Sequence, residues 1–128
     1  MQKAFIVVAL IVVPSLIIAS PGASWTKYKG YSEEDTEIAR KFYNTLKDGG
    51  VYAVEVRDIH MAIHIREHLY SIFKNRKIKG EQMIRDLFRG FQRGTGEKNV
   101  KIEFYFDKTH VITADWNVWD NQIEIKYH

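Results

Sequence analysis

The chain of 128 residues contains no cysteine. It therefore has no disulfide, no thiolate metal site and no cysteine nucleophile, although exported domains of this size often depend on disulfides. A glycine-rich phosphate loop, a G-x-S-x-G nucleophile elbow and a recognisable nucleophile triad are also missing. These absences argue against several common enzyme classes, and they leave burial of apolar side chains as the source of stability.

A large excess of charge of one sign is also missing, because 19 Lys and Arg residues accompany 16 Asp and Glu residues. The sequence pI of about 9.1 is therefore weak evidence for a nucleic-acid partner. The bases are nevertheless concentrated, since residues 74–101 hold nine Lys and Arg against three Asp and Glu. Such a segment is typical either of a solvated surface or of a site that attracts phosphate or carboxylate groups.

The first 24 residues have the layout of an export signal. Lys3 precedes an apolar run over residues 4–19, and the small residues of 20–24 follow it. Gly22 and Ser24 satisfy the preference for small residues before a cleavage site, which predicts Trp25 as the mature start. We therefore expect a secreted or periplasmic protein. The alternative is an uncleaved membrane anchor that leaves the domain facing outside, although a spanning helix needs about 20 apolar residues.

The rest of the chain has the length of one domain. We expect a linker over residues 25–31 and a single small α+β domain over residues 32–128. A capping Ser32 and helical spacing of apolar residues predict a helix over 33–47. A β-branched run predicts a strand over 51–56, and helical spacing returns over 80–93.

Residues 58–73 fit two interpretations. At 100° per residue their apolar side chains share one broad side and their histidines the other, which favours an amphipathic helix. Residues 61–66 also alternate between apolar and polar, which predicts a hairpin of 51–57 with 61–66 and a shorter helix after it. We favour the helix because its polar side stays coherent over four turns.

The last third alternates between apolar and polar residues in three runs, at 100–107, 112–118 and 123–127. A three-residue turn at 108–110 would pair Phe106 with Ile112, and a two-residue turn at 120–121 would pair Val118 with Ile123. The predicted fold is therefore α+β. It has an antiparallel sheet of three strands, or four or five if earlier segments join, with two or three amphipathic helices packed on one face.

One motif suggests a metal site. The five residues from His64 to His68 read H-x-x-E-H, which resembles the zinc-binding pattern of inverted zinc proteases. On a helix, His64 and His68 would share zinc, with Glu67 as the base and His60 as a third imidazole on the same side. The interpretation that we favour is a set of solvated histidines without a cofactor, because those enzymes are much larger and need a further acidic ligand.

Two groups of residues are candidates for surface contacts. The outward sheet face carries Tyr105, Asn117 and Trp119, which suit a sugar or a protein, whereas Trp116 falls on the inward face and is predicted to be core. Arg85, Arg89 and Arg93 lie four residues apart on the outer side of a helix and suit anionic groups. Stacking aromatics are missing from that helix side, so we expect no nucleic acid.

These observations favour a non-enzymatic, exported binding or accessory protein at an envelope or extracellular surface. Its partner would be a protein, a glycan or an anionic envelope component, with membrane contact only through an uncleaved leader. The alternative is a metal-binding protein or metallohydrolase that uses zinc at His60, His64, Glu67 and His68.

Overall fold

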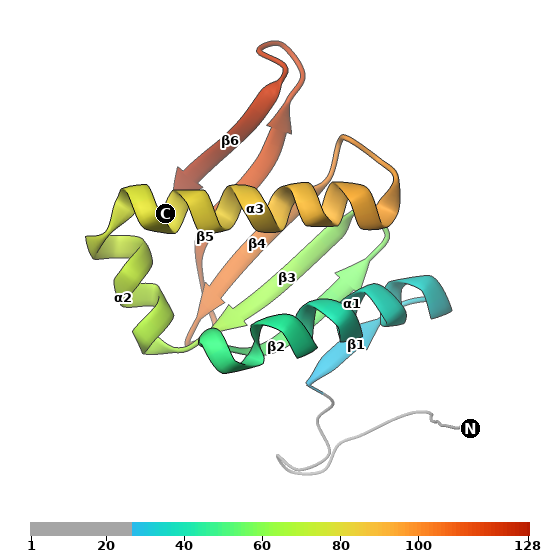
Figure 1. Ribbon diagram of the computed structural model, residues 1–128, viewed down its shortest axis with the longest axis horizontal. Coiled ribbons are helices and arrows are strands. Elements are labelled where there is room, and N and C mark those ends of the chain that lie inside the picture. The colour runs from blue at the N-terminus through green and yellow to red at the C-terminus, as the bar shows by residue number, and fades with distance from the viewer. Residues whose placement is uncertain (1–26) are drawn as a thin grey trace.

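Residues 27–128 are described by a computed structural model (Figure 1). The predicted signal peptide or membrane anchor, residues 1–24, lies outside the described residues. The elements in chain order are β1 (Tyr28–Gly30), α1 (Glu33–Leu46), a short 3-10 turn η2 (Lys47–Gly49), β2 (Val51–Arg57), β3 (His60–Ile65), α2 (Glu67–Asn75), α3 (Lys77–Thr95), β4 (Lys101–Phe106), β5 (Thr109–Asn117) and β6 (Gln122–Tyr127).

The strands form one six-stranded sheet in which the spatial order follows the chain order from β1 to β6. The sheet is mixed, because β1 runs parallel to β2 and β3 runs parallel to β4, while the other neighbours are antiparallel. The α+β class is thus confirmed, whereas the purely antiparallel sheet of three to five strands is wrong. Residues 28–30, which the sequence placed in a linker, supply the edge strand β1.

Helix α1 matches the helix predicted over 33–47 to within one residue. The Ser32 side chain accepts a hydrogen bond from the backbone N–H of Asp35 at 3.0 Å and so caps the first turn. Acidic residues in this turn interact favourably with the positive end of the helix dipole. Gly50, with φ of 107°, then reverses the chain into β2.

The helix predicted over 58–73 is wrong, and the alternative hairpin is close to what forms. Strand β3 pairs with β2 on one side and with β4 on the other, so both edges of its backbone are hydrogen-bonded. Met61, Ile63 and Ile65 are buried, while the residues between them face the other side of the sheet. Helix α2 begins only at Glu67, after the strand has ended.

The two turns of the C-terminal meander differ from the predicted turns. Asp107 and Lys108, both with positive φ, make a two-residue turn, and Phe104 lies opposite Ile112 instead of Ala114. A register shift at Val111 compensates for the shorter turn and keeps the apolar residues on one face. After β5, Trp116 pairs with Ile123 and a four-residue loop over 118–121 replaces the predicted two-residue turn.

The three helices lie on one side of the sheet, as Figure 1 shows, and the core fills the space between these two layers. Four phenylalanines are completely buried there: Phe73, Phe88, Phe91 and Phe104. Gly80 permits the close contact between α2 and α3, because a Cβ atom at this position would lie 2.9 Å from Cδ1 of Phe73. None of the helices in residues 27–128 is long and apolar enough to cross a membrane.

Candidate functional site

The structure separates the residues of the H-x-x-E-H pattern. His60 and His64 lie on β3 and face the side of the sheet without helices, whereas Glu67 and His68 belong to the first turn of α2. The spacing of one helical turn that would let His64 and His68 share a zinc ion is therefore absent. Within residues 27–128, no group of three or more histidine and acidic side chains is arranged to hold a metal ion.

The three predicted contact residues of the sheet face also lie apart. Tyr105 pairs with His110 at one end of β5, while Asn117 lies at the other end. The Asn117 side chain accepts hydrogen bonds from the backbone N–H groups of Trp119 and Asp120, at 2.9 and 3.0 Å, and thereby shapes the β5–β6 loop. Trp119 stands at the tip of this hairpin with 92% of its surface exposed.

The three arginines predicted as an anion-binding stripe do lie along α3, but they have different surroundings. Arg85 is 3.9 Å from the Glu81 carboxylate one turn earlier. Arg89 and Arg93 instead line a pocket that begins at the C-terminal end of α3. These two arginines therefore share one pocket, whereas Arg85 is partly neutralised by its neighbour.

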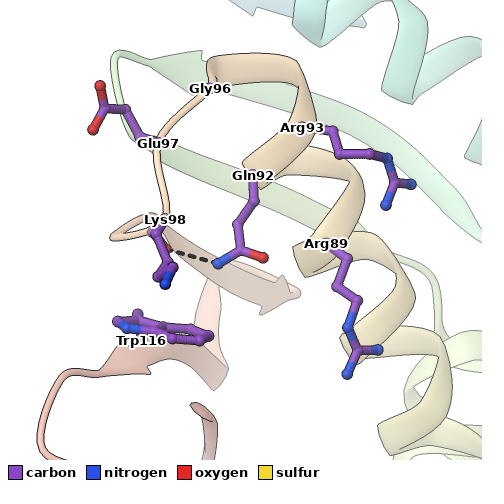
Figure 2. A pocket seen from close by; sticks show the side chains of 7 residues that line it. All are labelled: Arg89, Gln92, Arg93, Gly96, Glu97, Lys98 and Trp116. Carbon is purple, nitrogen blue, oxygen red and sulfur yellow. Dashed lines mark hydrogen bonds between the residues drawn. The ribbon is translucent and has the colours of Figure 1, made fainter. Parts of the chain in front are cut away.

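This pocket is formed by three parts of the chain that the fold brings together (Figure 2). The last turns of α3 give one wall, the loop before β4 gives the end, and a side chain of β5 gives the floor. Its volume is about 390 Å³, which falls within the usual range for small-molecule sites. The lining residues are Arg89, Gln92, Arg93, Gly96, Glu97, Lys98 and Trp116.

Local hydrogen bonds hold the loop beside the helix. Gly96 adopts a left-handed conformation with φ of 76° and ends α3, as glycine does at many helix termini. The Gln92 side chain donates a hydrogen bond of 2.8 Å to the backbone carbonyl of Lys98, which Figure 2 shows as a dashed line. The Lys98 ammonium then lies 5.4 Å from the ring centroid of Trp116, within the range of a cation–π interaction.

The pocket is electropositive. Arg89, Arg93 and Lys98 form no ion pair with any residue of the described part of the chain. Glu97 is the one acidic residue of the lining, and Figure 2 shows its carboxylate on the far side of the loop from Trp116. Such a concentration of cations along one pocket attracts anions and gives them several hydrogen-bond donors.

The sequence singled out Arg89 and Arg93, which line this pocket, but it did not single out the rest of the lining. Trp116 was predicted to be core, and its ring does pack against the core, yet it is only half-buried and also lines the pocket. Gln92 and Lys98 were not singled out at all. The signal that was available is the glycine that ends α3, because it turns Lys98 back toward the helix.

The opposite side of the sheet carries a row of rings, which we call the ring row: Tyr52, His64, Tyr105, His110 and His128. Successive ring centroids are 5.9, 5.3, 5.2 and 4.5 Å apart, and the Tyr105 ring is stacked with an imidazole on each side. Because the ring faces of Tyr105 contact these imidazoles, its ring edge is what meets solvent. The ring row therefore offers hydrogen-bonding edges more than flat surfaces for sugars.

Two groups of the ring row have shifted pKa values. Burial lowers the pKa of His64 below its usual value of 6.5, although the Glu55 carboxylate acts in the other direction. Burial raises the pKa of Tyr105, and the carboxylate of Glu103, which accepts its hydrogen bond at 3.3 Å, adds to that effect. Both shifts favour uncharged rings on this face of the sheet.

Comparison with protein-family models, with curated proteins and with solved structures gives no match for this chain. The side chains of the pocket and of the ring row are therefore the basis for a proposed function.

Proposed function

We propose that this chain is a small exported binding or accessory protein without enzymatic activity, which acts at an envelope or extracellular surface. The proposal is that it holds an anionic group of its partner in the pocket between α3, Lys98 and Trp116. The observation that carries the proposal is that three cations without ion-pair partners among the described residues line one pocket with Trp116, and the Lys98 ammonium lies 5.4 Å from the ring centroid.

The chemistry of the cations supports an oxyanion as the recognised group. Arg89 and Arg93 are four residues apart on α3, so their guanidinium groups extend from the same side of the helix. A guanidinium binds a carboxylate, sulfate or phosphate through two parallel hydrogen bonds, and Lys98 adds a third positive charge from the loop.

The shape of the pocket suits a large ligand that places only one of its units in the pocket. The pocket is an indentation at the surface, so it suits one end or one unit of a larger molecule. The Trp116 ring at its floor suits the apolar face of a sugar or a short acyl segment next to the charge. An acidic glycan of the cell envelope has both features. The lining contains one carboxylate and neither a histidine nor a hydroxyl nucleophile, which supports binding more than bond cleavage.

Calorimetric titration of the purified protein tests the binding proposal. The probes are an oligogalacturonate, a neutral oligosaccharide of the same length, and inorganic phosphate. We expect the acidic oligosaccharide to bind and the neutral one to fail. Arg89→Gln and Lys98→Gln should each weaken binding about tenfold or more, because each removes a charge-assisted hydrogen bond worth roughly 1.5–3 kcal/mol.

The matched control is Arg85→Gln, which removes the same charge one turn earlier on α3, where Glu81 lies 3.9 Å from the guanidinium. We expect this variant to bind as the wild type does, apart from a small salt-dependent loss. The pocket is not the site if neither the oligogalacturonate nor inorganic phosphate binds. It is also not the site if Arg85→Gln weakens binding as much as Arg89→Gln does.

The export part of the proposal has its own measurement. Intact-mass analysis of the protein from cell fractions should find a form outside the cytoplasm that lacks the first 24 residues. A form that keeps these residues and stays with the membrane would support the anchored alternative. A full-length protein in the cytoplasm would contradict both.

A further inference from the structure

Two histidines that are far apart in the sequence converge on one hydroxyl group of the open sheet face. Nε2 of His110 is 2.7 Å from Oγ1 of Thr113, and Nε2 of His128 is 2.8 Å from the same oxygen. The two imidazole ring centroids are 4.5 Å apart. Thr113 itself is buried in the sheet, so its hydroxyl fixes the point on which both rings are aimed.

The Thr113 hydroxyl cannot form the same kind of hydrogen bond with both imidazole rings. A hydroxyl group has one proton to donate, so it donates to one Nε2 atom and accepts from the other. At least one of these imidazoles therefore has an unprotonated Nε2 atom next to the Nε2 atom of its neighbour. Two convergent imidazole nitrogens at a solvent-accessible position are the donor set that copper(II), nickel(II) and zinc bind.

We propose that His110 and His128 form a binding site for a first-row transition-metal ion. The ion is coordinated by the two Nε2 atoms, and water molecules complete its coordination. Imidazole nitrogens bind zinc at about 2.0–2.1 Å, so both Nε2 atoms must turn from the Thr113 hydroxyl toward a shared ion. The site has two protein ligands, so it is distinct from a closed structural metal site.

The charges around the site nearly balance one another. On the same face, Thr113 pairs with Glu103 of β4 and with Lys126 of β6. The carboxylate of Glu103 favours a bound cation and the ammonium of Lys126 opposes it, so neither sign dominates. The ligand nitrogens then set the order of affinity, and copper(II) should bind more tightly than nickel(II) or zinc.

Titration of the purified protein, without a histidine tag, with copper(II), nickel(II) and zinc alone tests this proposal. We expect one equivalent of copper(II) to bind most tightly, with an electron paramagnetic resonance signal typical of two nitrogen ligands. His110→Gln and His128→Gln should each weaken binding by at least about tenfold, the scale on which metal sites respond to a lost supporting group. His60→Gln is the matched control, because His60 is exposed on the same face but outside the ring row.

Circular dichroism of each variant verifies that the fold is retained. Because His128 is exposed at the rim of the sheet, its variant is expected to fold even if the His110 variant does not. A second readout needs no variant: copper(II) should broaden the imidazole resonances of His110 and His128 before those of the other histidines. The proposal is overturned if no metal binds, if His128→Gln binds as the wild type does, or if His60→Gln loses as much affinity.

Discussion

The two faces of the sheet are built from the same strands and yet have different roles. On the covered face, side chains such as Phe104 and Ile102 are completely buried under the helices. On the open face, their neighbours Glu103 and Tyr105 are half-buried and form polar contacts with each other. Because successive residues of a strand point to opposite faces, one sequence run encodes both surfaces. Stability is thus concentrated on one face, and hydrogen-bonding groups remain available on the other.

The pocket lies where the covered face of the sheet reaches the solvent. Trp116 belongs to the covered face, but it lines the pocket at the C-terminal end of α3 (Figure 2). Its ring is therefore shared between the core and the solvent. The pocket forms at this position because the helix ends there.

The largest expected effect comes from truncating the covered face. Phe104 is completely buried, and its ring lies edge-on to Phe73 with centroids 5.4 Å apart. Phe104→Ala should reduce the free energy of unfolding by about 3–5 kcal/mol, because it removes apolar contacts and leaves a cavity. Tyr105→Ala, the adjacent residue on the open face, should cost about 0.5–1.5 kcal/mol through lost ring contacts. Urea denaturation measures both, and equal losses would contradict the division between the faces.

A second prediction concerns the edge of the covered face, where β1 meets α1. A Cβ atom at Gly30 would overlap the backbone nitrogen of Thr36, which cannot move without displacing the helix. Gly30→Ala should therefore cost about 1–3 kcal/mol, the usual range for overpacking. The matched variant Gly49→Ala has nothing within 4 Å of the new atom and should change stability by less than about 0.5 kcal/mol. Thermal unfolding of the two variants makes the comparison, and similar melting temperatures would argue against a tight contact at Gly30.

The third prediction uses the pH dependence of the open face. Burial lowers the pKa of His64 in the folded state below the usual 6.5, so at mildly acidic pH the unfolded state binds more protons at this residue. The contribution of His64 to stability is thus complete above pH 6.5 and decreases as the pH falls below that value. In His64→Gln the decrease in unfolding free energy between pH 7 and pH 5 should be smaller than in the wild type. An identical decrease in both proteins would exclude His64 as its source.

The smallest effect is expected at the hairpin tip. Trp119 is 92% exposed, so Trp119→Ser should change the free energy of unfolding by less than about 0.5 kcal/mol. The same substitution at Trp116, which packs against the core, should cost several times more. A large loss at Trp119 would show that the tip is packed against the rest of the protein in solution.

Local patterns in the sequence predicted the elements that depend on local contacts. The first helix, the strand after it and the three C-terminal strands were found because capping and alternation are encoded by neighbouring residues. Residues 58–73 could not be assigned in this way, since their spacing fits both periods. The parallel pairing of β3 with β4 decides between them, and this pairing joins residues as distant as His60 and Lys101.

Local sequence patterns also predict only part of the candidate sites. Arg89 and Arg93 could be read from helical spacing, but the approach of Lys98 to Trp116 depends on how the loop after α3 folds back. The convergence of His110 and His128 depends on a two-residue turn and a register shift, where the alternation of residues had predicted a three-residue turn without a shift. Single residues with positive φ, such as Lys108 in that turn, are not distinguished by hydrophobic periodicity.

The parallel contact between β3 and β4 also has a consequence for how the protein folds. Antiparallel hairpins close over short loops, whereas β3 and β4 can meet only after the chain has passed through both α2 and α3. We therefore expect an N-terminal half with β2 and β3, and a C-terminal half with β4 to β6, to acquire structure separately. The seam between these halves runs through the middle of the sheet, and its closure should set the rate of folding.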